Sequence, residues 1–202
     1  MKLGIMGGTF DPIHNAHLMV ASKVKEMFEL DKVLLMPTNN PPHKNLRSVS
    51  PSNERLELLR LAVEDYPELE VSTIELDRTG TTYTVDTLKQ LRAESSDNSL
   101  EIFYIIGADV VFDLQNWKDI STVFELCSFI AVLRPGFDRP KFAEKVNELR
   151  GGFNCRISIA ELPLMDICST ELRRAIALRD FDSLRGKMPG KVIEKIRRDA
   201  GI

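Results

Sequence analysis

The chain has 202 residues, a length that fits one domain built around a single hydrophobic core. Its 27 basic and 30 acidic residues give a net charge of −3, which argues against binding nucleic acid through bulk charge. No apolar run approaches the length of a membrane span, and residues 1–8 already have the pattern of a strand and a turn. We therefore expect neither a membrane anchor nor a signal peptide. The three cysteines lack the number and spacing of a disulfide framework or a zinc site, so we expect a protein of the reducing cytoplasm.

The first half of the chain alternates short apolar runs with helical patterns. Continuous runs rich in Ile, Val and Leu are typical of strands buried on both faces of a parallel sheet. Ser50 and Pro51 are residue types preferred at a helix start, so we place a helix there with Ser50 as the N-cap. In chain order we predict a strand at Leu3–Met6, a helix at Leu18–Phe28, a strand at Val33–Met36, a helix from Ser50 through Val63 and a weaker strand at Val71–Leu76.

The second half continues the alternation. Thr84 is a candidate cap for a helix whose apolar positions are Val85, Leu88 and Leu91. After it we predict strands at Ile102–Ile106 and Phe129–Leu133, a helix at Phe142–Leu149, a weaker strand at Ile157–Leu162 and a last helix containing Val192 and Ile196.

Strands that alternate with helices predict an α/β fold, a Rossmann-like doubly wound parallel sheet with helices on both faces. We expect residues 1–202 to form one domain. Ligands of such sheets bind beyond the carboxyl ends of the strands. Motif-like segments follow the predicted strand ends at Gly7–His17, Pro37–Lys44, Gly107–Asp109 and Arg134–Gly136. The functional site is therefore expected at this edge of the sheet.

The segment Gly7–His17 is the most informative of these. It is a glycine turn between a strand and a helix, and it ends with two histidines, His14 and His17, which share one helix face. The amides and the positive dipole end of a helix N-terminus favour a phosphate, to which the imidazoles can donate hydrogen bonds. The glycine spacing fits neither a dinucleotide fingerprint nor a Walker loop. We interpret the segment as a nucleotide phosphate site.

The same histidines could instead ligate a metal together with His43. Such a site would need a carboxylate or a water molecule as a further ligand. Because His43 belongs to a separate Pro-rich loop, we place phosphate binding ahead of metal binding and assign no metal ligand.

A second candidate site is the segment Ile167–Arg173. Ser169 or Thr170 is a good N-cap type, so a helix is expected to start here. The segment can be a plain helix start that carries a surface arginine. It can also be a second phosphate site, in which amides, hydroxyl groups and the guanidinium of Arg173 bind the anion.

Together, the two segments resemble the signatures of the nucleotidyltransferase superfamily, HxGH for Gly7–His17 and Ile-Ser-Ser-Thr-x-x-Arg for Ile167–Arg173. Within that superfamily, residues 1 to about 190 resemble the bacterial nicotinate-nucleotide adenylyltransferases. Further similarity lies in Pro37–Lys44, in Thr82–Leu88, and in Gly107–Asp109 followed by Trp117.

Two positions depart from these signatures. Ala16 stands where glycine is usual between the histidines, and Cys168 replaces the first serine of the second motif. Neither change removes a charged group or an imidazole, so we interpret both as variation within the family.

The resemblance implies transfer of the adenylyl group of ATP to nicotinate mononucleotide, which gives nicotinate adenine dinucleotide and pyrophosphate in NAD biosynthesis. It implies Mg²⁺ as the cofactor that accompanies ATP, and it leaves a homo-oligomer open. A phosphate nucleophile is already ionised near neutral pH and needs no general base. Catalysis is then expected to depend on positioning and on stabilising charge.

The resemblance also implies roles for individual residues. The expected catalytic residues are His14, His17 and Arg173. The residues expected to bind ATP are Gly7, Gly8, Thr9, Phe10, Gly107, Asp109, Ser169 and Thr170, with the helical segment 169–202 completing this site. The residues expected to bind the acceptor nucleotide are Asn39, Asn40, Lys44, Thr82, Tyr83, Thr84, Trp117 and Arg134.

Within the acceptor site, Trp117 is expected to stack on the pyridine ring, and amides near Tyr83 and Thr84 to meet the carboxylate. Lys44 is expected to meet the phosphate. Trp117 could instead be a core or rim tryptophan, and Asp109 could cap the helix that follows it.

Three other functions remain as alternatives. The nearest is another adenylyltransferase of the superfamily, such as the phosphopantetheine enzyme. A non-catalytic nucleotide-binding regulator is disfavoured because His14, His17 and Arg173 are retained. A nucleic-acid-binding module is disfavoured by the net charge and by the absence of aromatic residues within a basic stripe.

Overall fold

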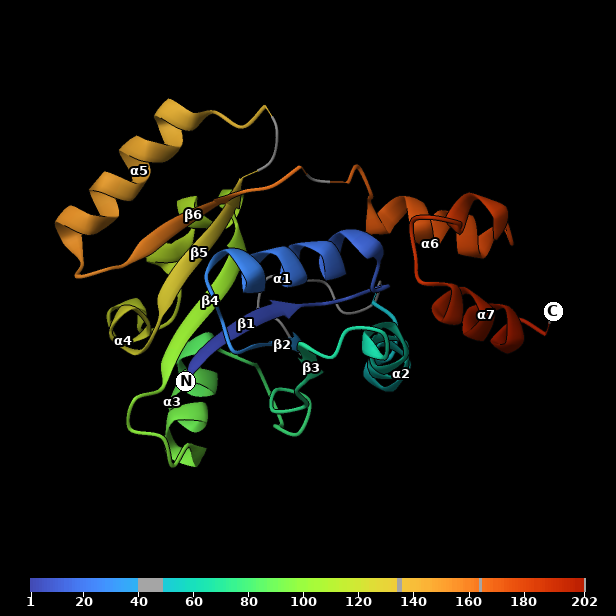
Figure 1. The fold of residues 1–202 in the computed structure, drawn as a ribbon, viewed down its shortest axis with the longest axis horizontal. Helices are drawn as coiled ribbons and strands as arrows, with labels where there is room; N and C mark the ends of the chain where they lie inside the picture. Colours follow the sequence, from blue (N-terminus) through green and yellow to red (C-terminus); the bar gives the residue numbers. More distant parts are fainter. Residues whose placement is uncertain (40–48, 134–135, 164, 202) are drawn as a thin grey trace.

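Six parallel strands form one sheet, in the order β3-β2-β1-β4-β5-β6 (Figure 1). The structure is a computed structural model that describes residues 1–39, 49–133, 136–163 and 165–201. Its strands are β1 (Lys2–Gly8), β2 (Lys32–Pro37), β3 (Leu69–Val71), β4 (Glu101–Gly107), β5 (Ser128–Leu133) and β6 (Ile157–Glu161). The predicted doubly wound α/β fold is confirmed.

Helices cover both faces of the sheet. One apolar core is formed with α3 (Thr84–Glu94), α4 (Ile120–Leu126) and α5 (Arg139–Gly152). The other is formed with α1 (Asn15–Met27), α2 (Ser52–Val63), α6 (Ser169–Ala177) and α7 (Gly190–Asp199). Successive strand residues supply opposite cores, as Tyr104 and Ile105 do in β4. Within the described ranges, no helix is both long enough and apolar enough to cross a membrane.

The strand order reverses between β1 and β4. From β1 the chain builds outward through β2 and β3, then returns to pair β4 with the other side of β1 and continues to β5 and β6. Ligands of doubly wound sheets bind at such a switch point, beyond the carboxyl ends of the two central strands. In this chain those ends are Gly8 and Gly107, which belong to two of the predicted functional segments.

Most of the predicted strands and helices are present, but the strand predicted at Val71–Leu76 is wrong beyond Val71. Strand β3 ends there, and the amides of Leu76 and Asp77 donate to the Thr73 carbonyl at 2.7 and 3.0 Å, which turns the chain. The N-caps predicted at Ser50 and Thr84 are each displaced by one residue, because Pro51 precedes α2 and Tyr83 precedes α3. Helix α1 begins at Asn15, three residues before the predicted Leu18. Helix α4 has seven residues, too few for its periodicity to be recognised.

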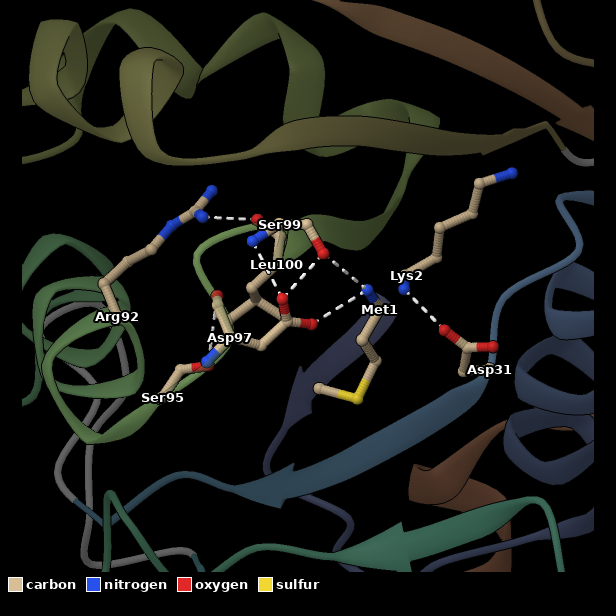
Figure 2. A network of polar contacts seen from close by, with 8 residues as sticks. All are labelled: Met1, Lys2, Asp31, Arg92, Ser95, Asp97, Ser99 and Leu100. Atoms are coloured by element: carbon tan, nitrogen blue, oxygen red, sulfur yellow. Dashed lines mark hydrogen bonds and ion pairs between the residues drawn. The ribbon is translucent and has the colours of Figure 1, made fainter.

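The start of β1 is fixed by polar contacts at the edge of the sheet opposite the carboxyl ends (Figure 2). The N-terminal ammonium of Met1 lies 3.0 Å from Asp97 and 3.5 Å from the hydroxyl of Ser99. Hydrogen bonds from Ser99 and from this ammonium lower the pKa of Asp97 to about 2. The amide of Lys2 donates to Asp31 at 2.6 Å. These contacts set where β1 begins relative to its neighbours.

At the opposite edge, Arg55 of α2 joins the segments that follow β1 and β2. Its side chain is only 2% exposed. The guanidinium donates to the carbonyl of Thr9 at 2.6 Å, of Thr38 at 2.9 Å and of Ser50 at 3.0 Å. Burial lowers the pKa of Arg55, and the nearby Asp11 carboxylate opposes that effect. One side chain thus supplies donors to three carbonyl groups from different parts of the chain.

We predict that Arg55→Met lowers the free energy of unfolding by roughly 3 kcal/mol, because the buried carbonyl groups lose their donors and the buried Asp11 carboxylate loses a nearby positive charge. Urea unfolding monitored by circular dichroism measures the change. The control is Arg60→Met on the same helix, where the arginine is exposed and the expected change is within about 0.5 kcal/mol. Equal effects of the two substitutions would contradict the role assigned to Arg55.

Candidate active site

A cleft of about 1160 Å³ opens at the carboxyl ends of β1 and β4. Segments far apart in the sequence line it, and they include members of both predicted motifs and of the predicted acceptor pocket. The predicted site residues among them are Gly7, Gly8, Thr9, His14, His17, Thr82, Tyr83, Thr84, Gly107, Trp117 and Ser169. The structure thus places the centre of the predicted site in a single cleft.

The starts of three helices converge on this cleft. The residues that precede α1, α3 and α6 are His14, Tyr83 and Cys168, and all three line it. Within the described part of the chain, neither His14 nor Tyr83 makes a capping hydrogen bond through its side chain. The positive ends of three helix dipoles therefore face one space, which suits a ligand with several anionic groups.

The two histidines stack against each other. Their ring centroids lie 3.7 Å apart with an interplanar angle of 21°, and the edge of Phe10 lies against His17 at 5.2 Å. His14 is 5% exposed, and its buried Nδ1 has no hydrogen-bond partner among the described residues. Burial lowers the pKa of His14 to about 4, so its imidazole is neutral at pH 7. A neutral imidazole can still donate one hydrogen bond to a phosphate.

Gly7 and Gly8 leave room that a side chain would fill. A Cβ on Gly7 would lie 2.5 Å from the hydroxyl of Tyr104, and a Cβ on Gly8 would lie 3.1 Å from the Phe10 ring. Phe10 has a left-handed backbone, with φ of 47°, and its ring is buried beneath the turn. The Phe10 side chain therefore supports the turn and His17, although we predicted this residue among those that bind ATP.

Aromatic side chains form the other end of the cleft. Trp117 is half-buried, with its ring 6.1 Å from those of both Tyr104 and Phe129 in edge-to-face contacts. Burial and the nearby charge of Glu75 raise the pKa of Tyr104. The ammonium of Lys118 lies 4.1 Å from the centre of the Tyr83 ring. An aromatic wall of this kind suits a flat ring as ligand.

The start of α6 completes the cleft. Helix α6 begins at Ser169, so Cys168 takes the N-cap position expected for Ser169 or Thr170. The backbone amides of Glu171 and Thr170 lower the pKa of the Cys168 thiol, which is exposed. The side chain of Asn15 donates to the Gly186 carbonyl at 2.9 Å, which joins the start of α1 to the C-terminal segment.

The structure does not place Arg173 in the cleft. Its guanidinium donates to the main-chain carbonyl of Asp11 at 2.6 Å and to the hydroxyl of Thr170 at 3.1 Å. Together with Asp11 and Arg55 it lines a second cavity, of about 350 Å³. Arg173 therefore holds the first motif from outside the cleft.

Other predicted residues also lie outside the cleft lining. The side-chain amide of Asn39 donates to the Arg78 carbonyl at 3.1 Å, and Thr170 accepts a hydrogen bond from Arg173. Asp109 is exposed, and its carboxylate lies so near Gly107 that a Cβ there would be 2.6 Å away. The predictions for Asn40, Lys44 and Arg134, and the metal alternative with His43, concern positions outside the described residues.

Several cleft residues were not predicted. Glu75, Asn116, Lys118 and Asp166 line the cleft, as does Tyr104. Glu75 and Tyr104 stand within segments that we interpreted only as strands, so a polar residue inside a predicted strand was the available signal. In the described part of the chain, no group of three or more His, Cys, Asp and Glu residues could hold a metal ion.

Comparison with known proteins shows the family of this chain. The family model described as cytidylyltransferase-like matches residues 5–175. A probable nicotinate-nucleotide adenylyltransferase of Citrifermentans bemidjiense is 43% identical, covering 98% of this chain and 96% of that protein. One of Thermoanaerobacter sp. (strain X514) is 40% identical, with 88% and 83% covered. The chain belongs to the nicotinate-nucleotide adenylyltransferase family.

A solved structure shares the fold. A Plasmodium falciparum nicotinic acid mononucleotide adenylyltransferase complexed with APC superposes with a TM-score of 0.76 at 19% identity, covering 98% of this chain and 96% of that one. At this identity the likeness concerns the fold alone. The family predicted from the two motifs is confirmed by the relatives, and the fold class by the superposition.

We predict that His14 makes the protein less stable as the pH falls from about 6.5 to about 4. The pKa of His14 in the folded protein is about 4, below the ordinary histidine value of 6.5, so in this window the unfolded chain binds the extra proton. The free energy of unfolding should fall by roughly 3 kcal/mol more in the native protein than in His14→Gln, which cannot titrate. Urea unfolding at several pH values measures this difference, and equal pH dependence in the two proteins would contradict it.

Proposed function

We propose that this chain transfers the adenylyl group of ATP to nicotinate mononucleotide, with release of pyrophosphate. The observation that carries the proposal is the convergence of three helix starts, two stacked histidines and an aromatic wall on one cleft. The triphosphate of ATP and the carboxylate of the acceptor are anions, and the pyridine is a flat ring. Membership of the family supports the same assignment.

In the proposed reaction, a phosphate oxygen of nicotinate mononucleotide attacks the α-phosphorus of ATP. The bond from the α-phosphorus to the bridging oxygen breaks, and the electron pair leaves with pyrophosphate. The attacking phosphate carries its negative charge at neutral pH, so no side chain has to remove a proton. The cleft accelerates the reaction by aligning the two phosphates and by stabilising the charge that moves to the leaving group.

His14 and His17 lie where a triphosphate would pass over the start of α1. Nδ1 of His14 is a buried polar atom that lacks a protein partner among the described residues, and a ligand can satisfy it. We assign both imidazoles as hydrogen-bond donors to the phosphates. Ser169 at the start of α6 is assigned to the outer phosphates. Thr170 and Arg173 can bind these phosphates only if Arg173 breaks its hydrogen bond to the Asp11 carbonyl.

The acceptor nucleotide is assigned to the aromatic end of the cleft. The pyridine ring would stack on Trp117, and its carboxylate would meet amides near Tyr83 and Thr84 at the start of α3. Amide donors favour a carboxylate over a carboxamide, because the amino group of a carboxamide offers them no acceptor. Asn40, Lys44 and Arg134 stay predictions for the acceptor, as Asp109 does for ATP.

Mg²⁺ is proposed as the companion of ATP. The described residues include no group of three or more His, Cys, Asp and Glu that could hold a metal ion. We assign the ion to the phosphate oxygens of ATP, which Mg²⁺ commonly uses as ligands. When bound, it neutralises part of the triphosphate charge. A location in the cytoplasm, a homo-oligomer and the treatment of residues 1–202 as one domain also stay predictions.

The proposed function is tested by pyrophosphate release from MgATP in the presence of nicotinate mononucleotide, nicotinamide mononucleotide or phosphopantetheine. We expect release mainly with the nicotinate compound, because the start of α3 offers donors to its carboxylate. Release mainly with phosphopantetheine would favour a different adenylyltransferase of the superfamily. No release with any acceptor would favour a nucleotide-binding regulator.

Substitution at the two ends of the cleft should separate the two substrates. His17→Ala should lower kcat by about 100-fold or more and change the KM for ATP much less, because its hydrogen bond strengthens as charge moves to the leaving group. Trp117→Ala should raise the KM for nicotinate mononucleotide roughly tenfold, because the ring loses its stacking partner. Steady-state kinetics with each substrate varied in turn measure both effects. An unchanged kcat in the first variant, or a change confined to ATP in the second, would contradict the assignments.

A further inference from the structure

The segment between β3 and α3 contains three buried polar atoms that no described protein group satisfies, and one of them, Nε of Arg78, lies outside the cleft lining. The other two are Oε2 of Glu75 and Oγ1 of Thr82, in side chains that are 3% and 8% exposed. Both residues line the cleft, next to Tyr83 and Thr84. Buried polar atoms without partners are rare in folded proteins, and at the wall of a cleft they indicate a ligand or water.

The other oxygen of Glu75 belongs to a buried polar network. Oγ1 of Thr87 donates to Oε1 of Glu75 at 3.0 Å, and the guanidinium of Arg78 donates to the same Thr87 oxygen. Thr87 is fully buried in the first turn of α3, and its amide donates to the Tyr83 carbonyl at 3.3 Å. The network therefore joins the segment after β3 to the helix start that faces the cleft.

The charges in this network are arranged so that they compensate one another. Burial raises the pKa of Glu75, whereas the Thr87 hydrogen bond and the positive charge of Arg78 lower it. A buried carboxylate without compensation would repel a second carboxylate placed at the start of α3. The guanidinium of Arg78, bonded to the same hydroxyl, offsets that repulsion.

We propose that Arg78 and Thr87 are positioning residues that make the start of α3 select a pyridine carboxylate over the corresponding carboxamide, with Glu75 as the buried acceptor that holds them in place. Thr87 fixes the amides of Tyr83 and Thr84 relative to the cleft, and Arg78 keeps the local charge favourable for an anion. Glu75 supplies the buried oxygen that accepts the hydrogen bond from Thr87 and so fixes the position of Thr87 and Arg78. This inference rests on the proposed function, because it concerns the acceptor of that reaction.

The test measures kcat/KM for nicotinate mononucleotide divided by kcat/KM for nicotinamide mononucleotide. Arg78→Gln leaves Glu75 without its counter-charge and should lower this ratio roughly five- to tenfold. Glu75→Gln retains the oxygen that accepts from Thr87 but leaves Arg78 in excess, and it should raise the ratio by a similar factor. The KM for ATP should change less than twofold in both variants. A lower ratio in Arg78→Gln together with a higher ratio in Glu75→Gln supports the proposal, because general loosening of the fold would change the ratio in the same direction in both variants.

Two further variants separate geometry from charge. Thr87→Val removes the linking hydroxyl with little change in volume and should raise the KM for the nicotinate compound, whereas Thr87→Ser should retain the native value. Lys89→Gln removes one positive charge from an exposed site on the same helix and should leave the ratio unchanged. Thermal unfolding of each variant confirms that the protein measured is folded.

The native protein must first turn over nicotinate mononucleotide, and failure there overturns the proposed function rather than this inference. With native activity present, an unchanged ratio in Arg78→Gln and Glu75→Gln overturns the inference. A shift in the same direction in both variants, or an equal shift in Lys89→Gln, also overturns it. If Arg78→Gln does not fold, Arg78→Lys retains the charge and should keep the native ratio, and loss of the preference in that folded variant overturns the role of charge.

Discussion

The arrangement of the cleft depends on one buried guanidinium. Arg55 donates to carbonyl groups of Thr9, Thr38 and Ser50, which lie after β1, after β2 and before α2. Parallel strands end side by side, but nothing in a sheet fixes the direction in which the chain leaves each strand. The planar guanidinium of Arg55 has five N–H donors, so it can fix the direction of several chain segments at once. A lysine ammonium could not reproduce that geometry. Phe10, which has a left-handed backbone conformation, directly follows Thr9, whose carbonyl accepts a hydrogen bond from Arg55.

The sheet supplies the second constraint. Because the strand order reverses between β1 and β4, the chain leaves these neighbouring strands in opposite directions. A space therefore remains between the segment that follows β1 and the segment that follows β4. Three helix starts face that space, and each brings a partial positive charge without placing a mobile cation in the cleft. The buried and neutral His14 fits the same principle, since it offers a donor whose charge does not change near pH 7.

The fold and the centre of the site could be predicted from the sequence because their signals are local. Continuous apolar runs indicated the buried strands, and Gly7–His17 directly follows the first of them. The convergence of Trp117 and Tyr83 on the same cleft was predicted from resemblance alone, because contacts between distant segments leave no spacing to recognise. Glu75 was missed because it stands in a segment that we interpreted only as a weak strand, and its partners become apparent only when the chain turns after Val71. Arg173 was assigned to the cleft from its motif, whereas its hydrogen bonds to Asp11 and Thr170 depend on how α6 packs.

The hydrogen bonds of Arg173 have a consequence for nucleotide affinity. The guanidinium already donates to the Asp11 carbonyl and the Thr170 hydroxyl and lies 3.8 Å from the Asp11 carboxylate, so a phosphate that binds it must compete with these partners. The net gain from such an exchange is smaller than the gross strength of an arginine–phosphate contact, because the guanidinium gives up a hydrogen bond to a carbonyl and the attraction of the Asp11 carboxylate. The exchange also frees the Asp11 carbonyl, and so couples occupation of the cleft to the conformation of the turn that begins at Gly7.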